Sequence, residues 1–383
     1  MDTYILKYEL KKRYEGLYRE IEKLIGFYYD NILSMELVDG MLNVTFTANE
    51  ENQEQFKHDI GREIDKFVKG YKEFDTDIMV ESKQKKEVCS EVNDLNYIEV
   101  ANGVRCKVGQ RAVIEDNLSN FIIQLFENNM PSCRFIAPSM IDYKTLIKLG
   151  YFTKFPNLVN FIKNFKKDPT LIRKISKGEL NIESPEIVDS YTDLSKKVLN
   201  PVTCYQVYPL ANKLIQSTGK SNFTVTGNVY RFESYNMSST RLNEFKIIEQ
   251  VHFGTKEEVI QIRNKEIELF TNLFNEWELD FKIETSSDVF YGDEAALLIS
   301  AQKYENGKFE ISMNSDKGYM SVGSFNLHNQ YFTERFHIYK ENELLTSGCC
   351  GFGIERLVYC IFSQHGEDIK HWPEKLKKDL FLI

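Results

Sequence analysis

The spacing of apolar positions in the first part of the chain predicts a small α+β unit. Over residues 4–28, apolar residues recur three or four positions apart among charges, as in an amphipathic helix: Leu10, Tyr14, Leu17, Ile21 and Leu24. The next stretch, ILSMELVDGMLNVTFTA, alternates apolar and polar residues around Asp39-Gly40, which is the pattern of a tight hairpin. A second charged helix over about 50–72 and a strand at Thr76–Val80 complete the unit, and the charged run ESKQKKEV follows as a linker or exposed connection.

From about residue 95 the pattern changes and predicts a larger sheet with helices around it. Helices are expected over 110–129 and 255–277, and the closing GFGIERLVYCIFSQHG is apolar at helical spacing. Beyond residue 200, short strand-like runs dominate: NFTVTGNVYRFE, EFKIIEQVHFG, KFEISMN and YMSVGSFNL. Because strands do not alternate strictly with helices, we expect a largely antiparallel sheet and an α+β class. We divide the chain into an accessory domain, residues 1–90, and a main domain, residues 91–383.

Composition narrows the classes of protein that fit. The 48 basic and 57 acidic side chains give a net charge of −9, which disfavours a protein devoted to binding phosphate backbones. The 27 Phe and 21 Tyr of the chain can fill large cores. The charged N-terminus and the lack of a long apolar run predict a cytoplasmic protein that does not enter membranes. The seven cysteines follow no regular framework, so we expect thiols that are buried or bound to metal in a reducing compartment.

Two short motifs are candidates for chemistry, and each is weak by itself. Arg231 and Glu233 stand two residues apart at a strand end, so they share one face and could grip one ligand; alone, they fit a surface ion pair better. Gly351-Phe352-Gly353-Ile354-Glu355-Arg356 predicts a strand-to-helix turn with an arginine in the first helical turn, where it can reach a phosphate. An isolated motif of this kind is usually only a tight turn.

Taken together, in this order and about 120 residues apart, the two motifs match motifs 2 and 3 of class II aminoacyl-tRNA synthetases. The chain from about Gly103 to its end resembles the amino acid:[carrier protein] ligases, which are relatives of the catalytic core of the atypical, zinc-dependent seryl-tRNA synthetases. The resemblance covers about 280 residues and is carried by GVRCKVGQRAVIED, RFIAPSMI, YKTLIKLGYFTKFPNL, DVFYG, AQKYE, SFNLH and CCGFGIERLVYCIFSQHGEDIKHWP. It implies a class II synthetase-like antiparallel sheet flanked by helices.

The resemblance also implies the residues that bind ATP. Arg231 matches the arginine that contacts the α-phosphate and the substrate carboxylate, where its planar fork suits the developing charge. Glu233 matches the acid near the adenine amino group, and Phe245 the ring on which adenine stacks. Arg356 matches the arginine at the γ-phosphate, and Arg241 is a further candidate for a phosphate contact. Mg²⁺ is expected with ATP, although the strand YMSVGSFNL lacks the glutamate that ordinary seryl enzymes use, and no ligand is assigned.

The same resemblance implies a zinc site formed by Cys204, Glu249 and Cys349. Two thiolates and a carboxylate fill three tetrahedral positions and leave one for the neutral α-amino group of an amino acid. Any one of these cysteines, considered alone, is more often a buried core thiol. Cys350 is adjacent, but the spacing to Phe352-Gly353 favours Cys349.

The remaining cysteines and histidines are expected to be structural, with one reservation. The cysteines are Cys89, Cys106, Cys133 and Cys360; of His252, His328 and His337, only His328 is considered within reach of substrate. Asp293 stands where the family usually has a basic residue, which leaves the identity of the substrate open.

The resemblance implies a homodimeric ligase that adenylates a small amino acid and passes it to the phosphopantetheine thiol of a carrier protein. One alternative is a seryl-like enzyme that charges tRNA or a tRNA-like acceptor through residues 1–90, although the net charge and the missing long coiled-coil arm make tRNA the less favoured partner. A second alternative is a non-catalytic synthetase-like paralogue, against which the intact ATP and metal residues count.

Overall fold

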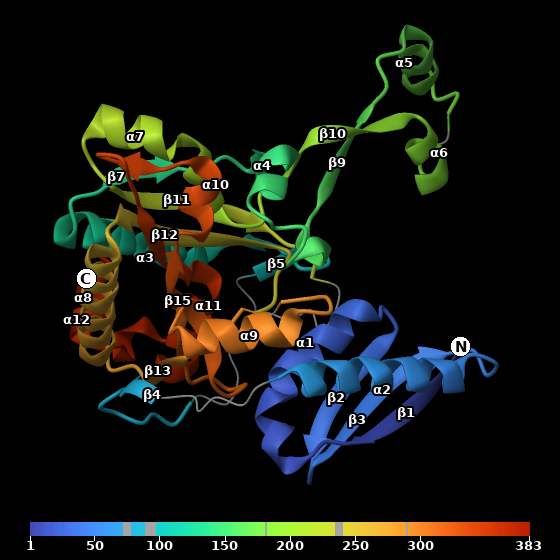
Figure 1. The fold of residues 1–383 in the computed structure, drawn as a ribbon, viewed down its shortest axis with the longest axis horizontal. Coiled ribbons are helices and arrows are strands. Elements are labelled where there is room, and N and C mark those ends of the chain that lie inside the picture. The colour runs from blue at the N-terminus through green and yellow to red at the C-terminus, as the bar shows by residue number, and fades with distance from the viewer. Residues whose placement is uncertain (72–77, 89–96, 181, 234–239, 289) are drawn as a thin grey trace.

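The centre of the molecule is an eight-stranded sheet with strand order β4-β13-β14-β15-β18-β12-β11-β7 (Figure 1). This computed structural model describes residues 1–383 except 72–77, 89–96, 181, 234–239 and 289. All neighbouring strands are antiparallel except β11 and β7, so the expected α+β class with a largely antiparallel sheet is confirmed. The strands are β4 (Ile78–Glu81), β13 (Phe281–Thr285), β14 (Lys308–Met313), β15 (Met320–Asn329), β18 (Thr346–Gly353), β12 (Glu244–Gly254), β11 (Asn222–Tyr230) and β7 (Cys133–Ile136).

One face of this sheet is covered by α3 (Gly109–Asn129), α8 (Lys256–Glu276), α11 (Ile354–His365) and α12 (Glu374–Asp379). In α3, apolar side chains four residues apart form one stripe that is fully buried: Ile114, Leu118, Ile122 and Phe126. They pack with Phe270 of α8 and Phe352 of β18. The helices predicted over 110–129 and 255–277 and at the C-terminus are therefore confirmed.

A second core lies on the opposite face of the sheet, and strand alternation separates the two. Cys350 belongs to the core under the helices, whereas Cys349 belongs to the other core, because successive side chains of a strand point to opposite faces. The second core contains Val225 of β11, Val251 of β12 and Tyr208, which lies in the segment between β10 and β11. Three further segments surround this core: residues 137–159, 198–211 and 332–345.

Around this face the chain forms short elements and one projecting arm. The arm consists of β9 (Phe161–Phe165) and β10 (Thr192–Leu199), with α5 (Pro169–Ser176) and α6 (Pro185–Ser190) at its tip, and it extends away from the body of the molecule (Figure 1). The other short elements are β8 (Met140–Asp142), α4 (Tyr143–Lys148), α7 (Ala211–Thr218), α9 (Ala295–Tyr304), α10 (Tyr331–Phe336), β5 (Tyr97–Ala101), β6 (Val104–Lys107), β16 (Tyr339–Lys340) and β17 (Glu343–Leu344).

The N-terminal unit is a three-stranded sheet of order β1-β3-β2 with two helices. Its elements are β1 (Asp2–Glu9), α1 (Tyr18–Tyr28), β2 (Ile32–Val38), β3 (Met41–Ala48) and α2 (Gln53–Gly70). The hairpin predicted at Asp39-Gly40 is confirmed: both residues have positive φ, 50° and 75°, as a tight two-residue hairpin turn requires. The predicted second helix corresponds to α2.

The helix predicted over residues 4–28 is wrong in its first third. Residues 2–9 form β1, which pairs with β3 from Asp2↔Ala48 to Glu9↔Met41. In this stretch Tyr4, Leu6 and Tyr8 alternate toward the core of the unit, and this period of two defines a strand. A short 3-10 helix, Lys12–Leu17, then leads into α1.

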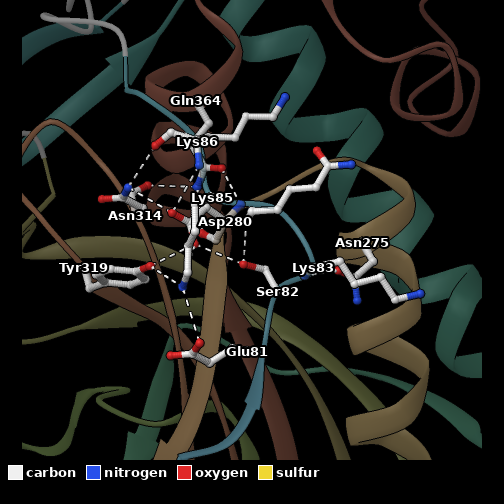
Figure 2. Close-up of polar contacts among 11 residues, drawn as sticks. Glu81, Ser82, Lys83, Lys85, Lys86, Asn275, Asp280, Asn314, Tyr319 and Gln364 are labelled. Atoms are coloured by element: carbon white, nitrogen blue, oxygen red, sulfur yellow. Dashed lines mark hydrogen bonds and ion pairs between the residues drawn. The ribbon is translucent and has the colours of Figure 1, made fainter.

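The strand predicted at Thr76–Val80 does not complete the N-terminal unit. The described part is β4, which pairs with β13 at the edge of the large sheet; Thr76 lies outside the described residues. The charged run that follows is held by buried Asp280, whose carboxylate accepts from Ser82 Oγ at 3.0 Å and Tyr319 OH at 2.8 Å (Figure 2). Lys85 Nζ lies 3.6 Å from Asp280 Oδ1. The connection is thus fixed on the main domain.

In the described part of the chain, no helix is both long enough and apolar enough to cross a membrane.

We predict that Asp280→Ala destabilises the protein by about 2–4 kcal/mol, because several donors around the buried carboxylate lose their acceptor. Urea unfolding followed by circular dichroism measures this. The matched control is Glu81→Ala. Glu81 is exposed, and its Oε2 makes a surface ion pair with Lys85 Nζ at 3.7 Å, so its removal should change stability by less than about 0.5 kcal/mol. Equal losses in the two variants would contradict the anchoring role of Asp280.

Candidate active site

The first part of the site is the hairpin between β11 and β12. These strands pair down to Tyr230↔Glu244, and beyond them the Arg231 N–H donates to Asn243 O at 2.9 Å. The Glu233 N–H donates to Asn243 Oδ1, also at 2.9 Å. The ion pair that forms is Arg241 with Glu233, at 2.9 Å, so the surface pair between Arg231 and Glu233 is not what the hairpin contains. Residues 234–239 of the loop lie outside the described residues.

Arg231 and Arg356 converge on this hairpin from different elements. Arg231 Nε donates to Pro201 O at 3.0 Å, and its guanidinium carbon lies 5.4 Å from the centre of the Phe245 ring. Arg356 Nε donates to Thr240 O at 2.7 Å. Among the described residues, no carboxylate lies within ion-pair distance of Arg231 or Arg356. Both guanidinium groups therefore keep charge available for an anion.

Arg356 is positioned by a strand-to-helix turn, as predicted. β18 ends at Gly353 and α11 begins at Ile354. The neighbouring Glu355 carboxylate accepts from the Lys246 N–H at 3.0 Å and is paired with Lys107. Glu355 thus ties the first turn of α11 to β12 and β6. The Arg356 side chain is partly buried, and this burial lowers the pKa of its guanidinium.

The second part of the site is a cluster of Cys204, Glu249 and Cys349, all at most 7% exposed. One ligand atom from each lies within 4.8 Å of the others. Glu249 Oε2 also accepts from the Cys204 N–H at 2.6 Å. Opposite Glu249 in the paired strand is Gly351; a Cβ there would lie 2.7 Å from Glu249 Cγ, so this glycine gives the Glu249 side chain its room.

The protonation of this cluster is suited to a cation. Burial, together with Cys349, raises the pKa of Glu249 to about 8. A hydrogen bond from Cys204 lowers the pKa of Cys349 well below its ordinary value, while the pKa of Cys204 is raised. Three acidic groups thus share fewer charges than they could carry, and a metal ion can replace their protons.

His328 lies beside the cluster rather than in the core. Its Nε2 is 3.7 Å from Cys349 Sγ, and its Nδ1 is 2.9 Å from Tyr208 OH. The other two histidines differ: His252 is buried with Glu266 at 3.1 Å, and His337 ends α10 with φ 52°. Of the other cysteines, Cys106 and Cys133 lie toward the surface and Cys360 is buried in α11, while Cys89 lies outside the described residues.

Sequence reasoning missed a third group, formed by Asp288, Lys308 and Glu310. Lys308 Nζ lies 2.8 Å from Asp288 Oδ1 and 3.7 Å from Glu310 Oε1. Glu310 also accepts from Ser286 Oγ at 3.0 Å. A signal existed, because Lys308 and Glu310 alternate with buried Phe309 and Ile311 along a central strand. Two charges on one face of such a strand indicate a polar cavity beside it.

Arg231 links the three parts electrostatically. Its charge contributes to the electrostatic surroundings of Glu249, Lys308 and Arg356. Asp293, by contrast, is exposed and lies near Tyr28 of the N-terminal unit. The arrangement offers several cations together with a cluster of three side chains that can ligate a metal, which suits a substrate with an anionic end and a Lewis-basic end.

Known proteins resemble this chain in sequence and in fold. Residues 189–365 match the family model described as the tRNA synthetase class II core domain (G, H, P, S and T). The chain is 28% identical over 288 residues to amino acid–[acyl-carrier-protein] ligase 1 of Bradyrhizobium diazoefficiens, covering 74% of this chain and 86% of that protein. It is 26% identical over 287 residues to the type-2 serine–tRNA ligase of Methanopyrus kandleri, covering 69% of this chain but only 54% of that protein.

Among solved structures, the chain resembles M. kandleri SerRS in its complex with A. aeolicus tRNASec, with a TM-score of 0.69 at 20% identity. This likeness covers 99% of this chain and 77% of that one. The N-terminal unit is therefore included in the fold likeness, although we placed residues 1–90 outside the sequence resemblance.

Residues 189–365 thus carry the class II tRNA synthetase core domain, and the similar sequences support an enzyme of this class. The predicted resemblance is confirmed, because the chain is similar in sequence both to amino acid–[acyl-carrier-protein] ligases and to type-2 serine–tRNA ligases.

We predict that Lys308→Met lowers the melting temperature at neutral pH and that the difference from wild type narrows in acid. Burial raises the pKa of Asp288, but Lys308 outweighs it and brings the pKa to about 2. Because the pKa of Asp288 is lower in the folded state, its charged carboxylate stabilises the fold at pH values above the unfolded pKa of about 4. This stabilisation is lost as the pH falls from about 4 to about 2.

Thermal melts between pH 3 and pH 7 measure this difference. The control is Lys57→Met, which removes a surface pair with Glu54 at 2.8 Å and should change little at any pH. A gap between Lys308→Met and wild type that stays constant over this range would contradict the prediction.

Proposed function

We propose that the protein is an AMP-forming ligase that activates a small amino acid with ATP and transfers it to the phosphopantetheine thiol of a carrier protein. The observation that carries the proposal is the convergence of Arg231 and Arg356 beside the cluster of Cys204, Glu249 and Cys349. A class II core and similarity to two amino acid–[acyl-carrier-protein] ligases support it.

In the first step, a carboxylate oxygen of the amino acid attacks the α-phosphorus of ATP. The bond from this phosphorus to the bridging oxygen breaks, and pyrophosphate leaves. Arg231 would hold the substrate carboxylate and the α-phosphate, where charge builds up. Glu233 would accept from the adenine amino group, Phe245 would stack on adenine, and Arg241 and Arg356 would bind the outer phosphates. In the second step, the thiol sulfur of the partner attacks the carbonyl carbon, and AMP leaves.

The residues of the cluster fit zinc, since two sulfur donors and one carboxylate lie within 4.8 Å of one another. Cys204, Glu249 and Cys349 would hold the ion. Zinc bound there would supply a Lewis acid with one open position for a neutral α-amine. Asn326 Nδ2 donates to Cys349 Sγ at 3.4 Å and His328 lies against the same sulfur, so both side chains would stabilise its thiolate form.

The carboxylate of Glu310 fits the magnesium ion that accompanies ATP. It lies between Lys308 and Ser286 and contributes to the electrostatic surroundings of Arg356. Carboxylate oxygens are the protein ligands that magnesium prefers, together with substrate phosphates. We also propose that the protein forms a homodimer, as the family resemblance implies.

The second candidate function is the charging of tRNA or a tRNA-like acceptor. It is favoured by one observation: the fold likeness to a serine–tRNA ligase solved with tRNA includes the N-terminal unit. The net charge of −9 counts against it. A non-catalytic paralogue is disfavoured, because the residues that bind nucleotide and metal in the proposal converge in one place.

We predict about one zinc ion per purified chain and its loss in Cys204→Ala, because a three-ligand site cannot lose a thiolate and keep its affinity. Metal analysis by mass spectrometry measures the content, and amino-acid-dependent ATP–pyrophosphate exchange should disappear with the zinc. The control is Cys350→Ala, whose side chain points into the opposite core; it should retain both. Zinc retained in Cys204→Ala would show that this cysteine is structural.

We predict that, with ATP and the twenty amino acids offered singly, at least one amino acid becomes a thioester on a phosphopantetheinylated carrier protein. Radiolabelled amino acid and acid precipitation measure the product. Arg231→Ala should lower pyrophosphate exchange by about a hundredfold or more, since transition-state charge loses its partner.

A carrier protein without its phosphopantetheine arm is the control acceptor and should stay unlabelled. Labelling of bulk tRNA in place of the carrier protein would favour the second candidate function. No exchange with any amino acid would contradict both.

A further inference from the structure

A short hairpin outside the two nucleotide motifs touches both of them. It consists of β5 and β6, which pair from Tyr97↔Lys107 to Ala101↔Val104. The turn between the strands contains Gly103, whose φ of 68° suits a tight turn. At its other end, β6 leads into α3 after Lys107. The hairpin therefore has two ends that can contact separate parts of the site.

The turn of the hairpin is bound to the β11–β12 hairpin through Asn243. The Asn243 N–H donates to Gly103 O at 2.7 Å, and its Nδ2 donates to Asn102 O at 3.0 Å. The same residue accepts from the Arg231 N–H on its main-chain oxygen and from the Glu233 N–H on Oδ1, both at 2.9 Å. Asn243 thus joins the turn to the residues assigned to the α-phosphate and to adenine.

The other end of the hairpin is bound to the first turn of α11 through Lys107. Lys107 Nζ donates to the Glu355 carboxylate and lies 3.3 Å from Glu115 Oε2 of α3. Both oxygens of Glu355 also accept from the Lys246 N–H of β12, at 3.0 Å. Arg356 is the next residue after Glu355, so the place of its guanidinium depends on the same helical turn.

The contacts of Lys107 are buried and charged. The side chains of Glu115 and Glu355 are only 5% and 3% exposed, and that of Lys107 is 29% exposed. Burial disfavours the charge of Lys107, but the two carboxylates outweigh burial and raise its pKa. Glu115 is held in addition by the Tyr97 OH, which donates to it from the paired strand. Charge-assisted hydrogen bonds away from water are strong, so they fix positions firmly.

We propose that the β5–β6 hairpin positions the nucleotide site, with Asn243 and Lys107 as its positioning residues. Asn243 sets the main chain that carries Arg231 and Glu233, and Lys107 sets the helical turn that carries Arg356. The spacing of the two guanidinium groups, and with it their fit to one triphosphate, therefore depends on a hairpin outside both motifs. The proposal rests on the proposed function, which supplies the identity of the nucleotide.

Equilibrium binding to the full chain, by calorimetry with magnesium, tests the proposal with AMP, pyrophosphate and α,β-methylene-ATP. Asn243→Ala is expected to weaken AMP about tenfold and pyrophosphate less than about threefold, because Arg231 and Glu233 lose their support. Lys107→Met is expected to weaken pyrophosphate about tenfold and AMP less than about threefold, because the turn that carries Arg356 loses its anchor. Both variants should bind α,β-methylene-ATP more weakly than wild type.

A conservative variant and a matched control accompany these measurements. Lys107→Arg keeps a cation between the two carboxylates and should recover most of the affinity for pyrophosphate. The control is Glu99→Gln, because Glu99 lies on the same hairpin and pairs with Arg105 at 3.3 Å, with 48% of its side chain exposed; all three affinities should stay unchanged. If Lys107→Met is poorly folded by circular dichroism, Lys107→Gln replaces it.

Two results overturn the proposal. The first is unchanged affinity for α,β-methylene-ATP in both variants. The second is an equal loss of AMP and pyrophosphate in each well-folded variant, which would mean that the hairpin supports the fold as a whole and does not position either end of the nucleotide.

These outcomes are separate from those of the proposed function. If wild type shows no pyrophosphate exchange but the two variants show the expected opposite losses, the positioning role stands and the proposed reaction fails. If exchange is present and neither variant changes nucleotide binding, the reaction stands and the positioning role fails.

Discussion

The pairing of β12 with β18 in the middle of the large sheet is the interaction on which the site depends. Its register sets Glu249 opposite Gly351 and Val251 opposite Cys349, and thereby joins two stretches that lie 100 residues apart in the chain. The same pairing leads β18 into Gly353 and α11, so the position of Arg356 follows from it. A slip of one residue would turn Cys349 into the opposite core and remove it from Glu249.

The two faces of the sheet around this pairing bury different kinds of side chain. The helical face is mostly apolar and holds the large aromatic side chains of α8 with Phe352, although it also buries His252 with Glu266 of α8. The other face accepts buried charge, and it does so by local compensation: Lys308 with two carboxylates, and Arg241 with Glu233. What remains uncompensated there is positive. This imbalance gives the proposed reaction its physical basis, since the transition state of adenylation develops negative charge beside a site that can hold a metal.

The N-terminal unit is joined to this arrangement at two places. The segment after β4 is held by Asp280 through a network of hydrogen bonds (Figure 2), and α9 is buried in the core of the unit. A unit packed in this way moves with the main domain. Its helix α1 therefore has a fixed position on the main domain, with Glu20 near Lys303 and the Phe27 ring against Tyr291.

The sequence by itself determined the class of the fold, the Asp39-Gly40 hairpin, the long helices and the family resemblance, because each depends on local periodicity or on motifs that stay together in the chain. It also named Arg231, Arg356 and the cluster of Cys204, Glu249 and Cys349 through the resemblance. Only the tertiary structure decided that residues 2–9 form a strand, because β1 needs β3 as its partner. Likewise, β4 joined the large sheet by pairing with β13, which lies some 200 residues further along the chain. Such contacts depend on how separate elements pack, and no local pattern records this.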